Sequence, residues 1–369
     1  MYSFGIALAV SLIVSLIILR LARLSGAGLL FDHDVENARK LHAVAVPRIG
    51  GLAIFVAVVI GAVLIWLRDR QTGGLILILV ACAAPSFAGG IAEDLSKRVS
   101  PTVRMACMAL SCLLGFHFLD ITISRVDIGM FDRWLGFSPL GIALTVLALM
   151  TITNAVNLID GLNGLAGVVA ISMFAALGYV GFKVNDPFVL SSSLLMAGSI
   201  AGFLFWNYPK GHIFLGDGGA YFLGFVLGGL SILLVTRNAS VSAWFPLLLL
   251  AYPLVEVAFS IYRRRIVKGR PAGIPDAAHM HQLIYKRVVR WAVGASEPGL
   301  KTQRNAMTAP YLWGLSSLAV VPAVALYDRT AWLAGFFVLF VVSYVWLYLR
   351  IVRLRVPRWL ITRRTHDGE

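Results

Sequence analysis

Long apolar stretches alternate with short polar segments along almost the whole chain. Eleven of these stretches approach or reach the roughly 20 residues that an α-helix needs to cross the hydrocarbon of a bilayer. They cover residues 3–22, 50–67, 74–91, 103–119, 138–155, 164–182, 188–206, 217–236, 241–262, 309–327 and 331–350. The pattern therefore predicts an all-α polytopic membrane protein with ten or eleven transmembrane helices, since two of the closely spaced central stretches could merge.

Composition supports this class. The 369 residues are 59% hydrophobic and 14% charged, outside the range of a soluble domain. Arg20 and Arg23 follow the first stretch, which lacks a small-residue cleavage site, so we expect a retained helix rather than a removed signal peptide. Without internal repeats or low-complexity tracts, residues 1–369 form a single expected membrane domain, and residues 263–308 form its long cytoplasmic loop.

The positive charges predict the orientation. With eleven spans and the N-terminus outside, 25 of the 32 Lys and Arg residues would face the cytoplasm and seven the opposite side. The net charge of +14 then reflects orientation and contact with the anionic lipid bilayer. We expect no nucleic-acid partner, because the basic residues are divided among loops between spans. The three cysteines lie inside spans and suggest neither a disulfide framework nor a metal site.

Four polar gaps between the spans contain acidic, amide or histidine residues, and this topology places all four on the cytoplasmic side. They include Glu93-Asp94, the segment 154–161, the segment 214–219 and the segment 279–282. Carboxylates at the ends of apolar spans are costly unless they serve a function. If helix packing brings the gaps together, they would form a metal-assisted site for a phosphorylated substrate.

Each gap also has a structural interpretation. Glu93 and Asp94 could form a solvated pair that ends a helix, or could hold a divalent cation. Asn154, Asn157 and Asp160 lie three residues apart and would share one helical face, where amide and carboxylate oxygens suit Mg²⁺ but could also join helices.

The remaining polar positions have similar alternatives. Asp217 could cap the N-terminus of the eighth span, or direct its carboxylate to a metal-bound phosphate. His279 and His281 are two residues apart, so on a helix they would point in different directions. We rank zinc low there because further ligands are lacking, and expect donors to a pyrophosphate. In the loop 32–51, Lys40, His42 and Arg48 are candidate phosphate contacts.

Taken in order, these motifs resemble those of the polyprenyl-phosphate N-acetylhexosamine-1-phosphate transferases, which include bacterial undecaprenyl-phosphate GlcNAc-1-phosphate transferases. The resemblance runs from about residue 30 to 290. It comprises Lys40-Leu41-His42, Pro47-Arg48-Ile49-Gly50-Gly51, Glu93-Asp94, the Asn-x-x-Asn-x-x-Asp-Gly-x-x-Gly-Leu string of 154–165, the Phe-Leu-Gly-Asp-Gly-Gly string of 214–219 and His279-Met280-His281-Gln282. The string 154–165 is the most specific element.

The resemblance implies Mg²⁺-dependent transfer (with Mn²⁺ as the alternative ion) of a sugar-1-phosphate from a UDP-N-acetylhexosamine to undecaprenyl phosphate, with release of UMP. It assigns catalytic roles to Asp94, Glu93 and Asp160 and metal ligation to Asn157 and Asp217. The substrate contacts that it implies are Asn154, Asn163, Phe214, Lys40, His42, Arg104, Arg264, Arg265, His279 and His281. A bacterial inner membrane, multi-pass and with the active site on the cytoplasmic side, is the implied location, and a homodimer is compatible with the sequence.

Four positions depart from the family pattern. Glu93 replaces the first Asp of an acidic pair, Asn163 stands where bacterial members often have Asp, Arg104 replaces a Lys, and Gln282 replaces the last His of His-x-His-His. We expect activity, in a pathway for O-antigen or a similar surface polymer rather than for the cell-wall precursor made by phospho-MurNAc-pentapeptide transferases. The other readings are a transporter or flippase of an anionic polyprenyl lipid, with Glu256 as its in-span polar residue, and a binding protein without activity.

Overall fold

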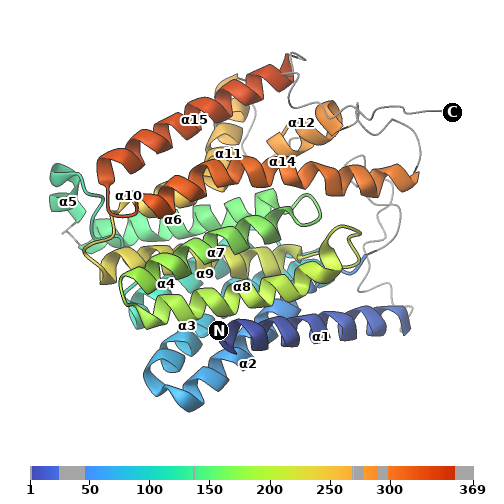
Figure 1. Cartoon of the computed structure of the whole chain (residues 1–369), viewed down its shortest axis with the longest axis horizontal. Helices are drawn as coiled ribbons and strands as arrows, with labels where there is room; N and C mark the ends of the chain where they lie inside the picture. Colours follow the sequence, from blue (N-terminus) through green and yellow to red (C-terminus); the bar gives the residue numbers. More distant parts are fainter. Residues whose placement is uncertain are drawn as a thin grey trace.

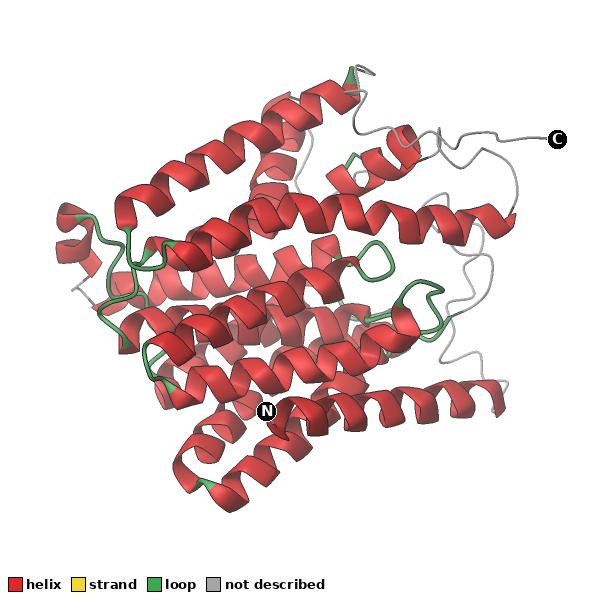
Figure 2. Ribbon diagram, viewed as in Figure 1, coloured by secondary structure: helices red, strands yellow, loops and turns green. Residues whose placement is uncertain are grey.

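A computed structural model describes residues 2–24, 46–135, 138–267, 269, 278–289 and 298–353. The helices in this part of the chain are α1 (Tyr2–Leu24), α2 (Gly50–Arg68), α3 (Arg70–Ser96), α4 (Pro101–Leu119), α5 (Gly129–Leu135), α6 (Ser138–Ile159), α7 (Leu165–Lys183), α8 (Pro187–Asn207), α9 (Gly216–Arg237), α10 (Trp244–Leu249), α11 (Ala251–Tyr262), α12 (Met280–Ile284), α14 (Pro298–Ala325) and α15 (Thr330–Val352). Two single π-helical turns, η1 (Arg263–Val267) and η2 (Tyr285–Val289), follow α11 and α12. No β-strand occurs among these described residues (Figure 2).

Most helices lie roughly side by side in a bundle, which is the arrangement expected of a multi-pass membrane protein (Figure 1). Within the described ranges, ten helices are long and apolar enough to cross a membrane. Since a helix has all its backbone hydrogen bonds inside the segment, it is one of the few structures that lipid tolerates. The predicted all-α polytopic class is therefore confirmed.

The expected span 241–262 is interrupted. It consists of α10 and α11, which are separated by Leu250 at φ −92° and ψ 12°. Pro246 and Pro253 lie in the first turns of the two helices, where a missing N–H is tolerated. This interruption is why the described chain contains ten long helices rather than the larger of the two predicted numbers.

Several boundaries differ from the sequence prediction. Helix α3 continues through Ser96, so Glu93 and Asp94 lie in its last turns rather than after it. The segment 263–308 is not a plain loop, because α12 and the two π-helical turns lie within it and α14 begins at Pro298. Helix α5 occupies a connection in which no helix was predicted.

Helix α9 is the central element of the bundle. It packs against α2, α3, α4, α6 and α7, and all the residues of its most apolar window are buried. A helix that is apolar on every face belongs in such a position. Close approach depends on small residues: a Cβ added at Gly51 would overlap the backbone of Gly219, and one at Gly90 would meet the Gly218 Cα at 2.5 Å. The N-terminus of α9 is therefore pressed against α2 and α3.

Candidate functional site

Segments distant in the sequence converge at the N-terminus of α9. The Phe214 N–H donates to the Pro47 carbonyl at 2.9 Å, and the Gly50 N–H donates to the Phe214 carbonyl at the same distance. These bonds fix the entry to α2 beside the loop that precedes α9. Gly216, the first residue of α9, has φ +77°. A Cβ there would overlap the Arg48 carbonyl oxygen and lie 2.6 Å from an Asp94 oxygen. Glycine is the residue that this crowded left-handed position accepts.

Asp94 caps α9 from another helix. Its Oδ1 accepts the Asp217 N–H at 3.0 Å, and its Oδ2 accepts the Gly218 N–H at 2.9 Å. A helix N-terminus leaves such N–H groups without partners and attracts negative charge. The N-cap residue itself is Leu215, which offers no side-chain cap, so the interpretation of Asp217 as N-cap is wrong. The Asp217 carboxylate is left for another contact.

The Asp217 carboxylate forms an ion pair with Arg104, which lies in the first turn of α4. Arg104 Nη1 donates to Asp217 Oδ2 at 2.8 Å and to the Tyr221 hydroxyl at 3.4 Å, while Asn157 Nδ2 donates to the same hydroxyl at 3.3 Å. Arg104 Nε is buried and has no hydrogen-bond partner in the described part of the chain. Three helices thus place a carboxylate, an amide and an arginine around Tyr221.

Tyr221 was not among the candidates from the sequence. It follows Asp217 by four residues, so both side chains lie on one face of α9. This helical spacing was the available signal.

Asp160 lies just beyond the end of α6, and its electrostatic surroundings link it to the same region. Burial raises the pKa of Asp160 to about 7; the Arg48 charge opposes this shift, and the charges of Asp217 and Asp94 add to it. Nearby carboxylates that raise one another's proton affinity indicate a region with a deficit of positive charge. Such a region favours a bound cation.

The donor set fits a magnesium ion only as part of a larger complex. No group of three or more His, Cys, Asp or Glu side chains suited to a metal occurs among the residues that the structure describes. Mg²⁺ is commonly held by one or two protein oxygens together with substrate phosphates and water. Asn157, which is bonded to the Tyr221 hydroxyl, and Asp217, which is paired with Arg104, offer two such oxygens. The residues therefore fit an ion whose coordination the substrate completes.

Glu93 has a different environment from Asp94. Its Oε2 accepts the Val99 N–H at 2.9 Å and so holds the turn between α3 and α4. It also lies near enough to Arg104 to interact with its charge. A catalytic role for Glu93 remains a prediction, beside this evident structural one.

Two of the predicted asparagines have partners away from the carboxylates. Asn154 is exposed, and its Nδ2 donates to the Met150 carbonyl at 2.9 Å. Asn163 is 2% exposed; its N–H donates to Asn305 Oδ1 at 2.7 Å and its Nδ2 donates to the Pro209 carbonyl at 3.1 Å. Asn163 thereby ties the loop after α6 to the loop before α9. Lys40 and His42 lie outside the described residues.

The histidine segment lies against the loop after α6. An added Cβ at Gly161 would be 2.6 Å from His281 Nε2, which places this ring beside the segment that follows Asp160. Burial lowers the pKa of His281 to about 4, so its imidazole is neutral at ordinary pH.

The expected divergence of the two histidines is wrong. Their rings are parallel, within 4°, with centroids 5.7 Å apart. The reason is local: His279 is the N-cap of α12, with the extended values φ −70° and ψ 152°, and only His281 lies in the helix.

Three arginines follow α11 and differ in exposure. Arg263 is buried and donates to the Ala278 carbonyl and the Tyr348 hydroxyl, each at 2.8 Å. Arg264 is half-buried, with its Nη2 3.3 Å from His279 Nε2, and Arg265 is exposed. Of the predicted pair, Arg264 and Arg265, the structure joins Arg264 to the histidine segment.

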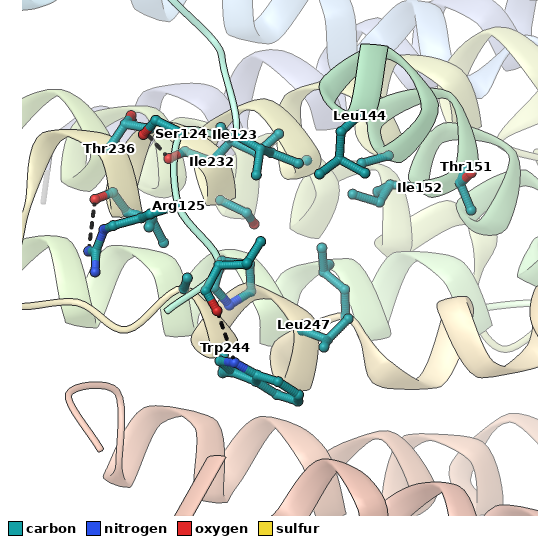
Figure 3. Close-up of a pocket in the computed structure, with 18 of the residues that line it drawn as sticks. Ile123, Ser124, Arg125, Leu144, Thr151, Ile152, Ile232, Thr236, Trp244 and Leu247 are labelled. Atoms are coloured by element: carbon teal, nitrogen blue, oxygen red, sulfur yellow. Dashed lines mark hydrogen bonds between the residues drawn. The ribbon is translucent and has the colours of Figure 1, made fainter. Parts of the chain in front are cut away.

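An apolar cavity of about 380 Å³ lies between α6, α9, α10 and α11, away from the polar cluster (Figure 3). Along α6 its lining extends from Leu144 to Ile152, and near α10 it includes Trp244 and Leu247. Thr151 in this lining precedes Asn157 by six residues, which is about 9 Å along a helix. On α9 the lining extends from Gly228 to Thr236, so the cavity lies beside the C-terminal half of that helix, and α6 connects it with Asn157.

Glu256 does not line this cavity. It is 1% exposed and both its oxygens have hydrogen-bond partners. A polar path through the membrane would expose such a carboxylate to the path, so this observation removes the main residue on which the transporter reading depended.

Comparisons with known proteins agree with the motifs. The model of glycosyl transferase family 4 matches residues 76–235. A protein of Bacillus subtilis (strain 168), described as a probable undecaprenyl-phosphate N-acetylglucosaminyl 1-phosphate transferase, is 32% identical over 368 residues, covering 95% of this chain and 92% of that protein.

Two further relatives are described as undecaprenyl-phosphate alpha-N-acetylglucosaminyl 1-phosphate transferases. The one from Haemophilus influenzae is 27% identical over 338 residues, covering 89% of this chain and 88% of its own length. The one from Thermotoga maritima is 28% identical over 261 residues, covering 70% of this chain and 74% of its own length. The similarity thus extends over nearly the whole chain and is not confined to one motif.

Proposed function

This chain belongs to glycosyl transferase family 4, and we propose that it transfers an N-acetylhexosamine-1-phosphate from a UDP-sugar to undecaprenyl phosphate and releases UMP. It is a membrane-embedded transferase, and the relatives described above are named for transfer onto the same lipid carrier. The observation that carries the proposal is the convergence of Asp94, Asp217, Arg104 and Asn157 at one end of the helical bundle.

The reaction joins two anions, and the site offers charges to manage this. An oxygen of the carrier phosphate attacks the phosphorus that bears the sugar; the bond from this phosphorus to the oxygen of the UMP phosphate breaks, and UMP departs with the bonding electrons. Arg48 and Arg104 lie where cationic groups would screen the repulsion between the two substrates. The orphaned Nε of Arg104 suits a phosphate oxygen.

Mg²⁺ held by Asn157 and Asp217 would neutralise charge on the diphosphate and on the leaving phosphate. The evident role of Asp94 is structural. By accepting the N–H groups of Asp217 and Gly218, it holds the first turn of α9 and with it the Asp217 side chain. Each Asp94 oxygen accepts one N–H and has a second lone pair, so Asp94 can also contact the carrier phosphate, as the family resemblance implies. Asp160 adds negative charge that favours the metal.

The apolar cavity suits part of the polyprenyl chain. Its lining is formed mainly by apolar side chains of α6, α9, α10 and the segment 123–128, with Arg125 and a few hydroxyl side chains among them (Figure 3). A carrier whose phosphate lies at the polar cluster could extend its first isoprenoid units into this cavity, where burial of apolar surface stabilises binding.

Orientation and pathway complete the proposal. The excess of Lys and Arg on the segments predicted to be cytoplasmic favours an orientation with the N-terminus outside and the site in the cytoplasm. The bacterial relatives support a bacterial inner membrane as the location. There the enzyme would begin an O-antigen or similar surface polymer.

The test is UMP release by the purified full-length protein in detergent. The assay contains undecaprenyl phosphate, Mg²⁺ and, in separate reactions, several UDP-N-acetylhexosamines; undecaprenol without phosphate serves as the control acceptor. We expect release that requires the phosphorylated lipid, stops with a chelator and returns with added Mg²⁺. Release with undecaprenol, or none with any donor from a well-folded protein, would contradict the proposal.

A further inference from the structure

A second buried carboxylate, Glu256 of α11, lies outside the carboxylate cluster. Its Oε1 is 3.0 Å from His279 Nδ1 and accepts the Met280 N–H at 3.1 Å, while its Oε2 accepts the Tyr344 hydroxyl at 2.7 Å. Glu256 is 1% exposed and Tyr344 is fully buried. A carboxylate in such a place is tolerated because its oxygens are satisfied.

These contacts determine the tautomer of His279. Arg264 Nη2 lies 3.3 Å from His279 Nε2, and a guanidinium can only donate, so Nε2 must accept. The ring proton is then on Nδ1, directed at Glu256, a carboxylate that accepts it. His279 therefore connects Glu256 to Arg264, and both of its ring nitrogens are engaged by these two residues.

The last helix supplies the outer end of this chain of contacts. Tyr344 lies on α15, nearly ninety positions after Glu256. One turn later Tyr348 donates to the Ala278 carbonyl at 3.2 Å, and Arg287 of η2 donates to the Ile351 carbonyl at 3.2 Å. Helix α15 thus contacts the residue before His279 at its backbone carbonyl, and contacts His279 indirectly through the Glu256 carboxylate.

We propose that Tyr344 and Glu256 are positioning residues: they fix the Nδ1–H tautomer of His279, whose Nε2 then holds the Arg264 guanidinium toward the phosphate groups of the nucleotide-sugar donor. This inference rests on the proposed function, because it names the donor as the ligand of Arg264. It assigns to α15 a part in donor binding, although this helix contains none of the family motifs.

We call the contacts from Tyr344 through Glu256 and His279 to Arg264 the relay, and the exposure of these residues shows which end of it a ligand can reach. Arg264 is half-buried, whereas Glu256, Tyr344 and His279 are each at most 4% exposed, so Arg264 is the member that a ligand can reach. His281 beside His279 packs against Gly161, which places the relay next to the loop that carries Asp160. A donor bound at the polar cluster would therefore lie within the neighbourhood of Arg264.

The test compares kinetic constants of the full-length enzyme in the UMP-release assay. We expect Tyr344→Phe and Glu256→Gln to lower kcat/KM for the donor about five- to tenfold, the effect of losing one hydrogen bond of a charged network, with the KM for the lipid unchanged. Thr330→Val is the matched control, because it removes from the same helix a hydroxyl whose hydrogen-bond partners are Ser242 and Asp127 and neither Glu256 nor His279. It should leave donor kcat/KM within about twofold of wild type.

A double-mutant cycle separates positioning from general stability. If Tyr344 acts through His279, the Tyr344→Phe change should cause no further loss of donor kcat/KM in a His279→Ala background. Losses of the two changes that multiply in the double variant would overturn the relay while the proposed function stands. So would an equal effect of Thr330→Val, or wild-type kinetics of both Tyr344→Phe and Glu256→Gln. Absence of UMP release by the wild type itself would overturn the proposed function, and the relay with it.

Discussion

Each end of helix α9 has an arginine–aspartate pair with an N–O distance of 2.8 Å, but the two aspartates have different surroundings. At the C-terminal end, Asp186 receives hydrogen bonds from Arg237 Nε, Asn238 Nδ2 and the Val189 N–H. At the N-terminal end, Asp217 is paired with Arg104, and the carboxylates of Asp94 and Asp160 lie nearby.

The pKa values differ accordingly. Burial raises the pKa of Asp186, but the hydrogen bonds from Arg237, Val189 and Asn238 outweigh it, and the pKa lies below its usual value. The pKa of Asp160, by contrast, is raised to about 7 by burial and by its acidic neighbours. One end of α9 therefore holds a carboxylate whose charge is fully compensated, as in a structural cap, and the other holds an excess of negative charge, as in a binding site.

The largest effect should come from neutralising Asp217. Asp217→Asn keeps the size of the side chain but removes a charge that the proposed metal and Arg104 both require. We expect kcat to fall by more than about a hundredfold, comparable to the loss of a transition-state contact. UMP release by purified protein measures this, and near-normal turnover would show that this end of α9 is also structural.

Asp186→Asn is the matched control and should affect stability instead. Because Arg237 in this pair is 41% exposed, solvent weakens the interaction, and we expect a loss of about 1–2 kcal/mol in unfolding free energy. Turnover per folded molecule should stay close to wild type. Thermal unfolding in detergent measures the loss of stability, and the UMP-release assay measures turnover. A large loss of turnover would contradict the purely structural role of Asp186.

The apolar cavity beside the C-terminal half of α9 can be filled to test the lipid assignment. Ala148 lines it, and Ala148→Phe should raise the KM for undecaprenyl phosphate about tenfold, because bulk replaces the space for an isoprenoid unit. The donor KM should not change. Ala143→Phe, the same substitution at an exposed position of α6 outside the cavity lining, is the control. Equal effects of the two variants would argue against the cavity as the tail site.

The smallest effect is expected at Glu93. The Glu93 carboxylate accepts a hydrogen bond from the Val99 N–H, which a glutamine oxygen can also accept, so Glu93→Gln should reduce turnover by no more than about threefold. A loss as large as that of Asp217→Asn would instead establish Glu93 as a functional partner of Asp94.

Much of the fold followed from the sequence, because spans of apolar residues have few alternatives in a membrane. The bounds expected for α9 differ from the observed ones by one residue at each end. The interruption at Leu250 was missed, since the residues around it are apolar and prolines in first turns do not mark a break by themselves. The extension of α3 through Asp94 was missed because charge was taken as the end of the helix.

The site was predicted less completely than the fold. The segments that meet at α9 were identified, but periodicity could not tell that Asp94 contacts backbone N–H groups of another helix while Glu93, its neighbour, holds a turn. The substrate contact of Asn163 remains a prediction, and its burial between two loops was not evident from the sequence. Such distinctions depend on contacts between distant parts of the chain. Tyr344 had no signal at all, because a tyrosine in an apolar span is ordinary.

The position of Tyr344 near the end of the chain has a consequence for how truncated copies should be judged. The part of the chain that matches the family model ends at residue 235, and every motif residue precedes residue 283. A copy cut after Asp328 by a premature stop codon would retain all of these motifs and would still be recognised as a member. It would nevertheless lack the hydroxyl that holds Glu256 and the carbonyl groups that anchor Arg287. A gene truncated in this way should be classified as defective, although its motifs are complete, because it does not encode α15.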